Sequence, residues 1–233
     1  TGPTGAIIIK NDSHRLWKEL NQEDTIAVAQ VAPAVRVAVA KEFGYNGENV
    51  MGKIVAALRR IGFNYIFDTS TAADLTVMEE SKEFADRLAN GGKLPLFTSC
   101  CPAWIKYAEN EYPEILPNIS TCRSPMQMFA SVINEKFKGE GKKILSVAVM
   151  PCTAKKGEAA RDEFKDENGK PLVDFVITTQ ELIMMIKEAG IVFNEIEPEA
   201  VDMPFGTMTG AGVIFGVTGG VTEAVIRRVS TDK

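Results

Sequence analysis

The sequence predicts an α/β fold with two lobes, each a small, mostly parallel, twisted sheet flanked by helices. Short apolar runs typical of buried strands alternate with longer segments whose apolar residues recur at helical spacing. The 233 residues suit one large or two small lobes with a sizeable core. We place the lobes at about residues 24–125 and 126–229, with the active site in the cleft between them.

The first lobe has three predicted strands, at residues 25–31, 64–67 and 94–97. Its predicted helices end at glycine, over 34–43 before Gly44, over 50–61 before Gly62, and up to Asn90 before Gly91. Asp74 is the predicted N-cap of the last of these. Pro33 and Pro102 each mark the first turn of a helix, where a missing N–H is tolerated.

The second lobe has two predicted strands, at residues 144–149 and 172–177. The residues TTQE at 178–181 have the form of a capping box for a helix that ends at Gly190. A glycine-rich stretch over 206–220 leads into a last helix over 221–229.

Composition excludes several classes of protein. Charged residues make up 24% and hydrophobic residues 45%, as in ordinary globular proteins, and the net charge of −5 does not favour nucleic acid. No apolar run approaches the roughly 18 residues that a membrane span needs. No signal-peptide pattern opens the sequence. We therefore expect a cytoplasmic protein without nucleic-acid or membrane partners.

Four cysteines carry most of the functional information: Cys100, Cys101, Cys122 and Cys152. They form no CxxC pair, which argues against structural zinc, and they do not look like a disulfide framework. The only histidine, His14, lies in a polar stretch and is expected at the surface. Cys100-Cys101 and Cys152 each follow a predicted strand, so soft thiolates stand at two strand ends. This placement suggests an iron–sulfur centre between them.

The two cysteine runs, TSCCPAW at 98–104 and MPCTAKK at 150–156, resemble the first two signature motifs of the active-site domain of iron-only ([FeFe]) hydrogenases. Four further runs share the resemblance: APAVR at 32–36, ADLTVMEE at 73–80, SP at 124–125 and GAGVIFG at 210–216. The family's third motif, which holds two more cluster cysteines, is absent. We therefore expect residues 1–233 to form a C-terminally incomplete catalytic domain that is inactive by itself.

The resemblance implies a cofactor called the H-cluster, a [4Fe–4S] cluster linked to a two-iron unit with CO, cyanide and a dithiolate bridge. It implies that Cys101 and Cys152 ligate the [4Fe–4S] cluster. If two thiolates are too few to hold this cluster, the 233 residues by themselves lack the cofactor. It also implies that the Cys100 thiol passes protons to and from the bridge. The alternative for Cys101 and Cys152 is a buried free cysteine, and the alternative for Cys100 is a packing thiol or a vicinal disulfide. Cys122 matches no ligand position and is expected to be a small buried residue.

The resemblance also implies a pocket around the two-iron unit. Lys155 would point its ammonium at a cyanide, whereas Lys156 is expected to be solvated. Ala32 and Pro33, before a helix N-terminus, would give backbone contacts near a second cyanide. An apolar wall is implied for Met150, Pro125 and Phe215, which are otherwise ordinary core residues. Met126 and Ala103 replace the family's usual glutamine and glycine.

A proton relay is implied for four residues: Glu80, Glu83, Ser120 and Arg87. Glu80, Glu83 and Arg87 fall at i, i+3 and i+7 on one face of a predicted helix, with Arg87 near the surface. The alternative is a solvated helix face with a weak Glu83–Arg87 ion pair.

The implied reaction is the reversible conversion of two protons and two electrons to H2, with ferredoxin or a similar electron carrier as partner. Three other functions stay open. They are a non-catalytic relative used in iron–sulfur protein assembly, a sensory relative that binds the cofactor, and a cluster-free interaction module. Cys100 and Lys155 argue against the assembly protein because both serve the two-iron unit. The absent third motif favours the interaction module.

Overall fold

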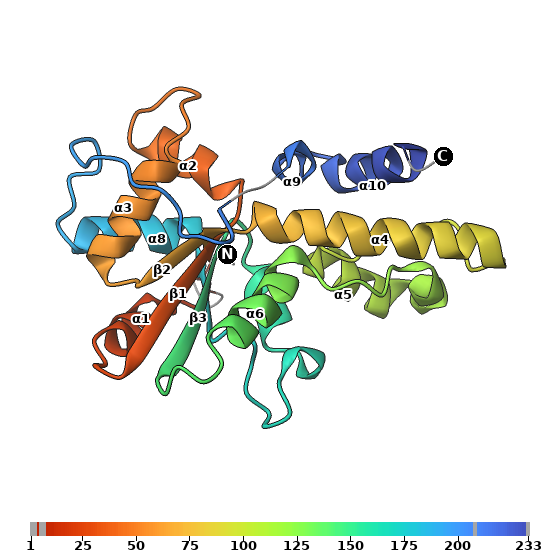
Figure 1. Cartoon of the computed structure of the whole chain (residues 1–233), viewed down its shortest axis with the longest axis horizontal. Coiled ribbons are helices and arrows are strands. Elements are labelled where there is room, and N and C mark those ends of the chain that lie inside the picture. Colours follow the sequence, from red (N-terminus) through yellow and green to blue (C-terminus); the bar gives the residue numbers. More distant parts are fainter. Residues whose placement is uncertain (1–3, 5–7, 207–208, 232–233) are drawn as a thin grey trace.

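The computed structural model describes residue 4 and residues 8–206 and 209–231. Figure 1 shows a sheet with helices packed around it and one long helix, α4, that projects away from it. The elements are α1 (Ser13–Leu20), β1 (Thr25–Val31), α2 (Val35–Glu42), α3 (Met51–Ile61), β2 (Tyr65–Asp68), α4 (Ser70–Asn90), α5 (Pro102–Glu111), the 3₁₀ helix η1 (Pro113–Asn118), α6 (Pro125–Lys136), β3 (Lys143–Met150), α7 (Ala154–Ala159), the 3₁₀ helix η2 (Asp162–Phe164), β4 (Phe175–Thr178), α8 (Thr179–Glu188), α9 (Gly210–Ile214) and α10 (Gly220–Thr231).

The four described strands form one parallel sheet in the order β2-β1-β3-β4. This confirms the α/β class and the parallel arrangement. The expectation of one sheet per lobe is corrected, because β1 pairs with β3 from Thr25↔Lys143 to Val31↔Val149. Both strands are buried along most of their length. This burial is typical of central strands in a parallel sheet, which have a strand at each edge and helices over both faces. The division into lobes at about residue 125 stays a prediction.

Helices cover both faces of the sheet. On one face, Ala29 and Val31 of β1 join a core with residues of α3 and α8, such as Leu58 and Leu182. On the other face, Val28 joins aromatic side chains of β2 and α6. Helices α9 and α10 lie along α4 beyond the sheet (Figure 1). None of the described helices is both long and apolar enough to cross a membrane.

The centre of the sheet is a topological switch point. The chain leaves β1 towards β2 and leaves β3 towards β4, in opposite directions across the sheet. In such sheets the two loops diverge at the carboxyl ends of the central strands and leave a crevice where ligands bind. Ala32 and Pro33 follow β1 at this edge, and Cys152 follows β3.

Several predicted ends are confirmed. Gly62 after α3 and Gly91 after α4 adopt the left-handed conformation, with φ of 119° and 69°, that glycine tolerates best. At α8 the capping box forms as expected, with Thr178 and Glu181 each accepting from the other's backbone N–H. Local sequence chemistry therefore determines where these helices begin and end.

Two predicted strands differ from the structure. Residues 94–97 form no strand of the sheet and make only a bridge between Phe97 and Ile119. Leu94 is 43% exposed and Pro95 has no backbone N–H to donate, so this apolar run cannot serve as a buried central strand. Strand β4 begins at Phe175 rather than at residue 172, because the Leu172 amide donates to the carbonyl of Phe164, the last residue of η2.

Asp74 does not cap α4, which begins four residues earlier at Ser70. Thr69 is the N-cap residue and makes no side-chain capping bond, whereas the carboxylate of the preceding Asp68 accepts from the Ser70 amide at 2.8 Å. Asp74 instead accepts from the amide of Thr209 at 2.7 Å and from its hydroxyl at 2.6 Å. It thereby ties α4 to the segment before α9.

Candidate functional site

The two cysteine loops lie against each other. Cys152 occupies the loop between β3 and α7, at the switch point, and Cys101 is the N-cap residue of α5. The Lys155 ammonium reaches across from α7 and donates to the backbone carbonyl of Cys100 at 2.9 Å. The sequence predicts that both loops follow strands of the sheet. Only Cys152 is so placed, because the segment before Cys100 is outside the sheet.

The four thiols differ in exposure. Cys101 is exposed, whereas Cys100, Cys122 and Cys152 are partly buried. Burial raises the pKa of the Cys100 thiol to about 11, the Lys155 charge acts in the opposite direction, and the charges of Glu80 and Cys101 raise it. The Cys100 thiol is therefore protonated at neutral pH and can donate a proton.

Lys155 is held by two partners. Besides the Cys100 carbonyl, its ammonium donates to the Glu158 carboxylate at 2.6 Å, one helical turn later on α7. The side chains of Lys155 and Glu158 are only 13% and 6% exposed. A cation in this position can serve a nearby anionic group.

Glu80 is a buried carboxyl on α4, with 1% of its surface exposed, and neither of its carboxylate oxygens has a hydrogen-bond partner. Burial raises its pKa, and the charge of Glu83 raises it further. The Ser120 hydroxyl and the backbone of Ser99 lower the pKa of Glu80, although neither is placed well enough to form a hydrogen bond with its carboxylate. A proton therefore binds to Glu80 more readily than to an ordinary carboxyl.

Glu83 lies one turn further along α4 and accepts several hydrogen bonds. Its Oε2 accepts from the hydroxyls of Ser120 and Thr121 and from the Thr121 amide, each at 3.0 Å, and the Cys122 Sγ lies at 3.6 Å. Burial alone would raise the pKa of Glu83, but hydrogen bonds from Arg87, Ser120 and Thr121 outweigh it and lower the pKa. Glu80 and Glu83 therefore have pKa values shifted in opposite directions.

Arg87 is more enclosed than its expected place near the surface implies. Its side chain is 14% exposed and donates to Glu83 at 2.6 Å. It also donates to the backbone carbonyls of Lys93, Pro117 and Ile119 at 2.9 to 3.1 Å. Arg87 thus holds the end of α4 against the segment that carries Ser120.

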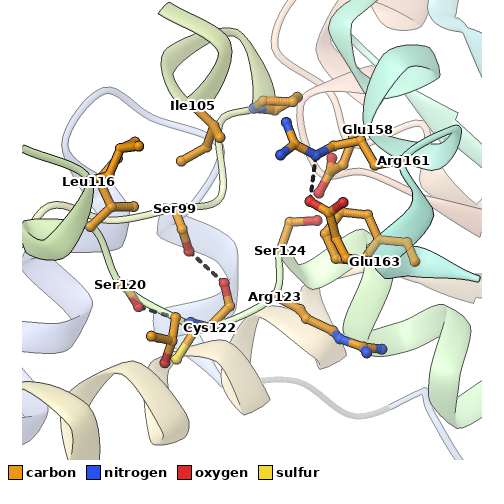
Figure 2. Close-up of a pocket in the computed structure, with 14 residues that line it drawn as sticks. Ser99, Ile105, Leu116, Ser120, Cys122, Arg123, Ser124, Glu158, Arg161 and Glu163 are labelled. Atoms are coloured by element: carbon orange, nitrogen blue, oxygen red, sulfur yellow. Dashed lines mark hydrogen bonds and ion pairs between the residues drawn. The ribbon is translucent and has the colours of Figure 1, made fainter. Parts of the chain in front are cut away.

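A cavity of about 400 Å³ lies beside these residues, between α5 and the segments around residues 120 and 160. Figure 2 shows Ser99, Ser120 and Cys122 on one side and Glu158, Arg161 and Glu163 on the other. The Ser99 hydroxyl donates to the Cys122 carbonyl at 2.6 Å and so joins the Cys100 loop to the Ser120 segment. The relay candidate Ser120 therefore borders an open space.

The apolar candidates occupy several positions. Ala32 and Met150 are buried at the carboxyl ends of β1 and β3, and Pro33 is partly buried before α2. Pro125 is the first residue of α6. Phe215 directly follows α9, which lies against α4, and is partly buried. The first three residues therefore lie at the same edge of the sheet as the Cys152 loop.

Two expectations on other residues are wrong, and one is confirmed. Lys156 is not solvated, because its ammonium donates to Asp12, Glu181 and the Val176 carbonyl and its side chain is 12% exposed. Cys122 is not a buried core residue but is partly exposed and lines the cavity, with its Sγ at 3.6 Å from the Glu83 carboxylate. His14 is exposed as expected.

Three residues at the site were not singled out from the sequence: Glu158, Thr121 and Ser99. Glu158 has a recognisable signal, since Lys155 and Glu158 are spaced i, i+3 on a helix. Thr121 and Ser99 bridge segments distant in the sequence, so no local pattern identifies them.

The side chains near the two cysteine loops supply part of the ligand set of an iron–sulfur cofactor. Among residues 4, 8–206 and 209–231, no three His, Cys, Asp or Glu side chains converge as a metal site. Cys101 and Cys152 offer two soft thiolates on neighbouring loops, with a cation and a protonated thiol beside them. These residues fit one side of a thiolate-bound cluster, which takes about four such ligands in all.

The fold and the site define an α/β domain of the iron-only hydrogenase type. The family described as iron only hydrogenase large subunit, C-terminal domain, matches residues 25–233, and the chain belongs to this family.

Hydrogenases and assembly proteins are both among its relatives. The chain is 45% identical to the NADP-reducing hydrogenase subunit HndD of Solidesulfovibrio fructosivorans and 42% identical to iron hydrogenase 1 of Clostridium pasteurianum, over 97% of its own length. It spans only 40% of each of those proteins. It is also 35% identical to cytosolic iron-sulfur assembly component 3 of Bos taurus, over 84% of this chain and 45% of that protein.

The fold matches a solved hydrogenase. A variant of the apo [FeFe]-hydrogenase of Chlamydomonas reinhardtii superposes with a TM-score of 0.81 at 39% identity, over 94% of this chain and 58% of that one. A related structure is named for the stepwise assembly of the [FeFe]-hydrogenase H-cluster.

Proposed function

We propose that this chain is the H-cluster-binding part of an iron-only hydrogenase, which converts protons and electrons reversibly to H2. One observation carries the proposal. The Lys155 cation is hydrogen-bonded to the backbone carbonyl of Cys100, and the charges of Lys155 and of the buried, unpartnered carboxyl Glu80 both act on the Cys100 thiol, whose pKa burial raises to about 11. Burying Glu80 without a hydrogen bond costs free energy, which a fold retains readily only where the group has a function.

Cys101 and Cys152 would hold the [4Fe–4S] cluster, and Lys155 would face the anionic ligands of the two-iron unit. Ala32, Pro33, Met150, Pro125 and Phe215 would line its surroundings and exclude water. When bound, the H-cluster supplies the metals on which protons and electrons combine. The protein supplies ligands, one cation and a route for protons.

Glu83, Ser120 and Glu80 would pass protons between the surface and Cys100. The Ser120 hydroxyl already donates to Glu83 at 3.0 Å, and Glu83 also lines an opening next to the exposed Glu79. Glu83, with a lowered pKa, accepts protons from solvent only weakly, whereas Glu80 holds them firmly. This difference favours transfer inward, towards Cys100.

The second candidate is a non-catalytic assembly protein. The relatedness to the bovine iron-sulfur assembly component favours it. Cys100, Lys155 and the carboxyls of α4 favour the hydrogenase, because an assembly protein needs no proton route to a thiol. A sensory role for the same cofactor site is the third possibility. For the hydrogenase, we further propose a ferredoxin-type electron donor and a cytoplasmic location.

The experiment compares the 233 residues with the full-length protein that contains them. Each is reconstituted with iron, sulfide and a synthetic two-iron precursor and supplied with reduced viologen. We expect H2 from the full-length protein and none from the 233 residues, which provide two thiolates instead of four. No H2 from the full-length protein, with iron bound, would contradict the proposal and favour the assembly protein. Turnover by the 233 residues would mean that other ligands complete the cluster.

A further inference from the structure

Helix α7 carries Lys155, yet little apolar surface holds this helix in place. It has only six residues, AKKGEA, and its buried members are Glu158 and Ala159. Isolated helices of this length are unstable, so most of their stability must come from tertiary contacts. For α7 those contacts are largely polar.

Lys156 provides three of these contacts. Its ammonium donates to the Val176 carbonyl of β4 at 2.7 Å and to the carboxylates of Asp12 and Glu181 at 3.0 Å each. Lys156, Asp12 and Glu181 are 12%, 7% and 6% exposed at their side chains. All three donor hydrogens of the ammonium are therefore used in a setting with little water.

Glu181 connects this cluster to the fold. Its Oε2 accepts from the Thr178 amide at 2.7 Å in the capping box of α8, and its Oε1 accepts from the Asp12 amide at 2.8 Å. Asp12 also faces Lys10 at 3.5 Å and Arg15 at 3.3 Å. The cluster thus joins α7 to β4, α8 and the segment before α1.

Neighbouring residues on a helix point about 100° apart. Lys155 and Lys156 therefore extend to different sides of α7, one to the Cys100 loop and the other to the Asp12–Glu181 cluster. Anything that fixes Lys156 also fixes the orientation of Lys155.

We propose that Lys156 is a positioning residue that clamps α7 to Asp12 and Glu181 and thereby holds Lys155 at the Cys100 loop. Asp12 precedes the 25–233 region that matches the family. The segment that carries Asp12, N-terminal to this region, therefore helps to hold the site residues in position. Only the role of Lys155 at the cofactor rests on the proposed function; the clamp that holds Lys155 in place does not.

The test begins with the 233-residue chain without cofactor. Hydrogen–deuterium exchange is followed in α7 and in β3 for Lys156→Met, Lys156→Arg and the control Lys187→Met. Lys187 also forms an ion pair, but with Glu42 at the surface of α8. We expect Lys156→Met to speed exchange in α7 by about tenfold or more while β3 changes little, because only a local opening becomes easier. Lys156→Arg should restore most of the protection, and Lys187→Met should leave it unchanged.

Equal exchange of α7 in Lys156→Met and wild type would overturn the inference, as would an equal increase in β3. If the Lys156→Met variant does not fold, the Asp12→Asn variant is used in its place. This substitution removes one carboxylate charge from the cluster but keeps the backbone N–H of residue 12, which donates to Glu181. We expect a smaller increase, confined to α7, and no increase would overturn the inference.

A second measurement follows Lys155 itself. The rate at which acetic anhydride acetylates Lys155 is measured by mass spectrometry in wild type, Lys156→Arg and Lys156→Met. We expect faster acetylation of Lys155 in Lys156→Met only, and an unchanged rate would overturn the inference. Both measurements need no cofactor, so failure of the hydrogenase proposal and failure of the clamp are separable.

Discussion

The Lys155 ammonium donates to the backbone carbonyl of Cys100 at 2.9 Å and joins two loops that are 55 residues apart in the sequence. One loop follows the central strand β3, and the other precedes α5. The contact places a cation beside a thiol whose pKa is raised by burial to about 11. It defines the candidate site more closely than any single motif does.

Lys155→Met should separate the two parts of the cofactor in the complete protein. The [4Fe–4S] signal should stay, because Lys155 is not a ligand, whereas infrared bands from CO and cyanide on iron should be lost. Lys165→Met, at an ion pair with the exposed Asp162, is the control and should keep the bands. Unchanged bands in Lys155→Met would show that the ammonium does not serve the two-iron unit.

Replacing either relay carboxyl should slow H2 production per assembled cluster. Glu80→Gln and Glu83→Gln keep the shape of the side chain but cannot carry a proton, so we expect a loss of about 100-fold or more. Ser120→Ala should act similarly, and Glu79→Gln, at the exposed neighbour on α4, should have little effect. Iron content should be unchanged throughout. Near-normal rates in both carboxyl variants would mean that protons take another route.

Arg87→Met should reduce stability, in contrast to the minor role that the sequence suggests. The variant loses hydrogen bonds to three carbonyls and to Glu83, and leaves that carboxylate partly unpaired. We expect a loss of about 2 kcal/mol in the free energy of unfolding, measured with urea. Lys138→Met, at an exposed pair with Glu135, is the control and should change nothing measurable. Equal stability of both variants would contradict this role.

Glu80 should make the protein less stable as pH rises. Burial raises its pKa above the ordinary value of 4.5, so the folded protein binds this proton more tightly than the unfolded chain does. Stability from Glu80 is full below pH 4.5 and is lost as pH rises through the folded pKa. Glu80→Gln should therefore be more stable than wild type at pH 8 and similar to it at pH 4, as measured by urea unfolding at both pH values. A difference that does not depend on pH would contradict the burial of an ionisable Glu80.

Local signals in the sequence were sufficient for most of the fold. Gly62, Gly91 and the Thr178–Glu181 capping box mark their helix ends because the cause lies within a few residues. Residues 94–97 misled because an apolar run cannot by itself indicate whether it is covered. The prediction of Asp74 as an N-cap is wrong because an acidic residue before an apolar stretch can equally lie within a helix, on its partly exposed face.

Motif positions located the candidate site, but not its contacts. Cys100, Cys152 and Lys155 were found from two short runs, and the structure brings them together. The partners of Arg87 and Lys156 are distant in the sequence, at Pro117 and Asp12 for example. Long-range hydrogen bonds leave no periodic pattern, so a solvated lysine and a buried one look alike in sequence.

Cys101 and Cys152 are proposed to bind the cluster, whereas Cys100 is proposed to carry protons. The decisive measurement is iron per protein in the reconstituted full-length protein for Cys100→Ala, Cys101→Ala and Cys152→Ala, with Cys122→Ala as the control. We expect iron to be retained in Cys100→Ala and Cys122→Ala, with H2 production lost only in the former. Iron should be lost in Cys101→Ala and Cys152→Ala. Loss of iron in Cys100→Ala, with retention in Cys101→Ala and Cys152→Ala, would contradict the assignment.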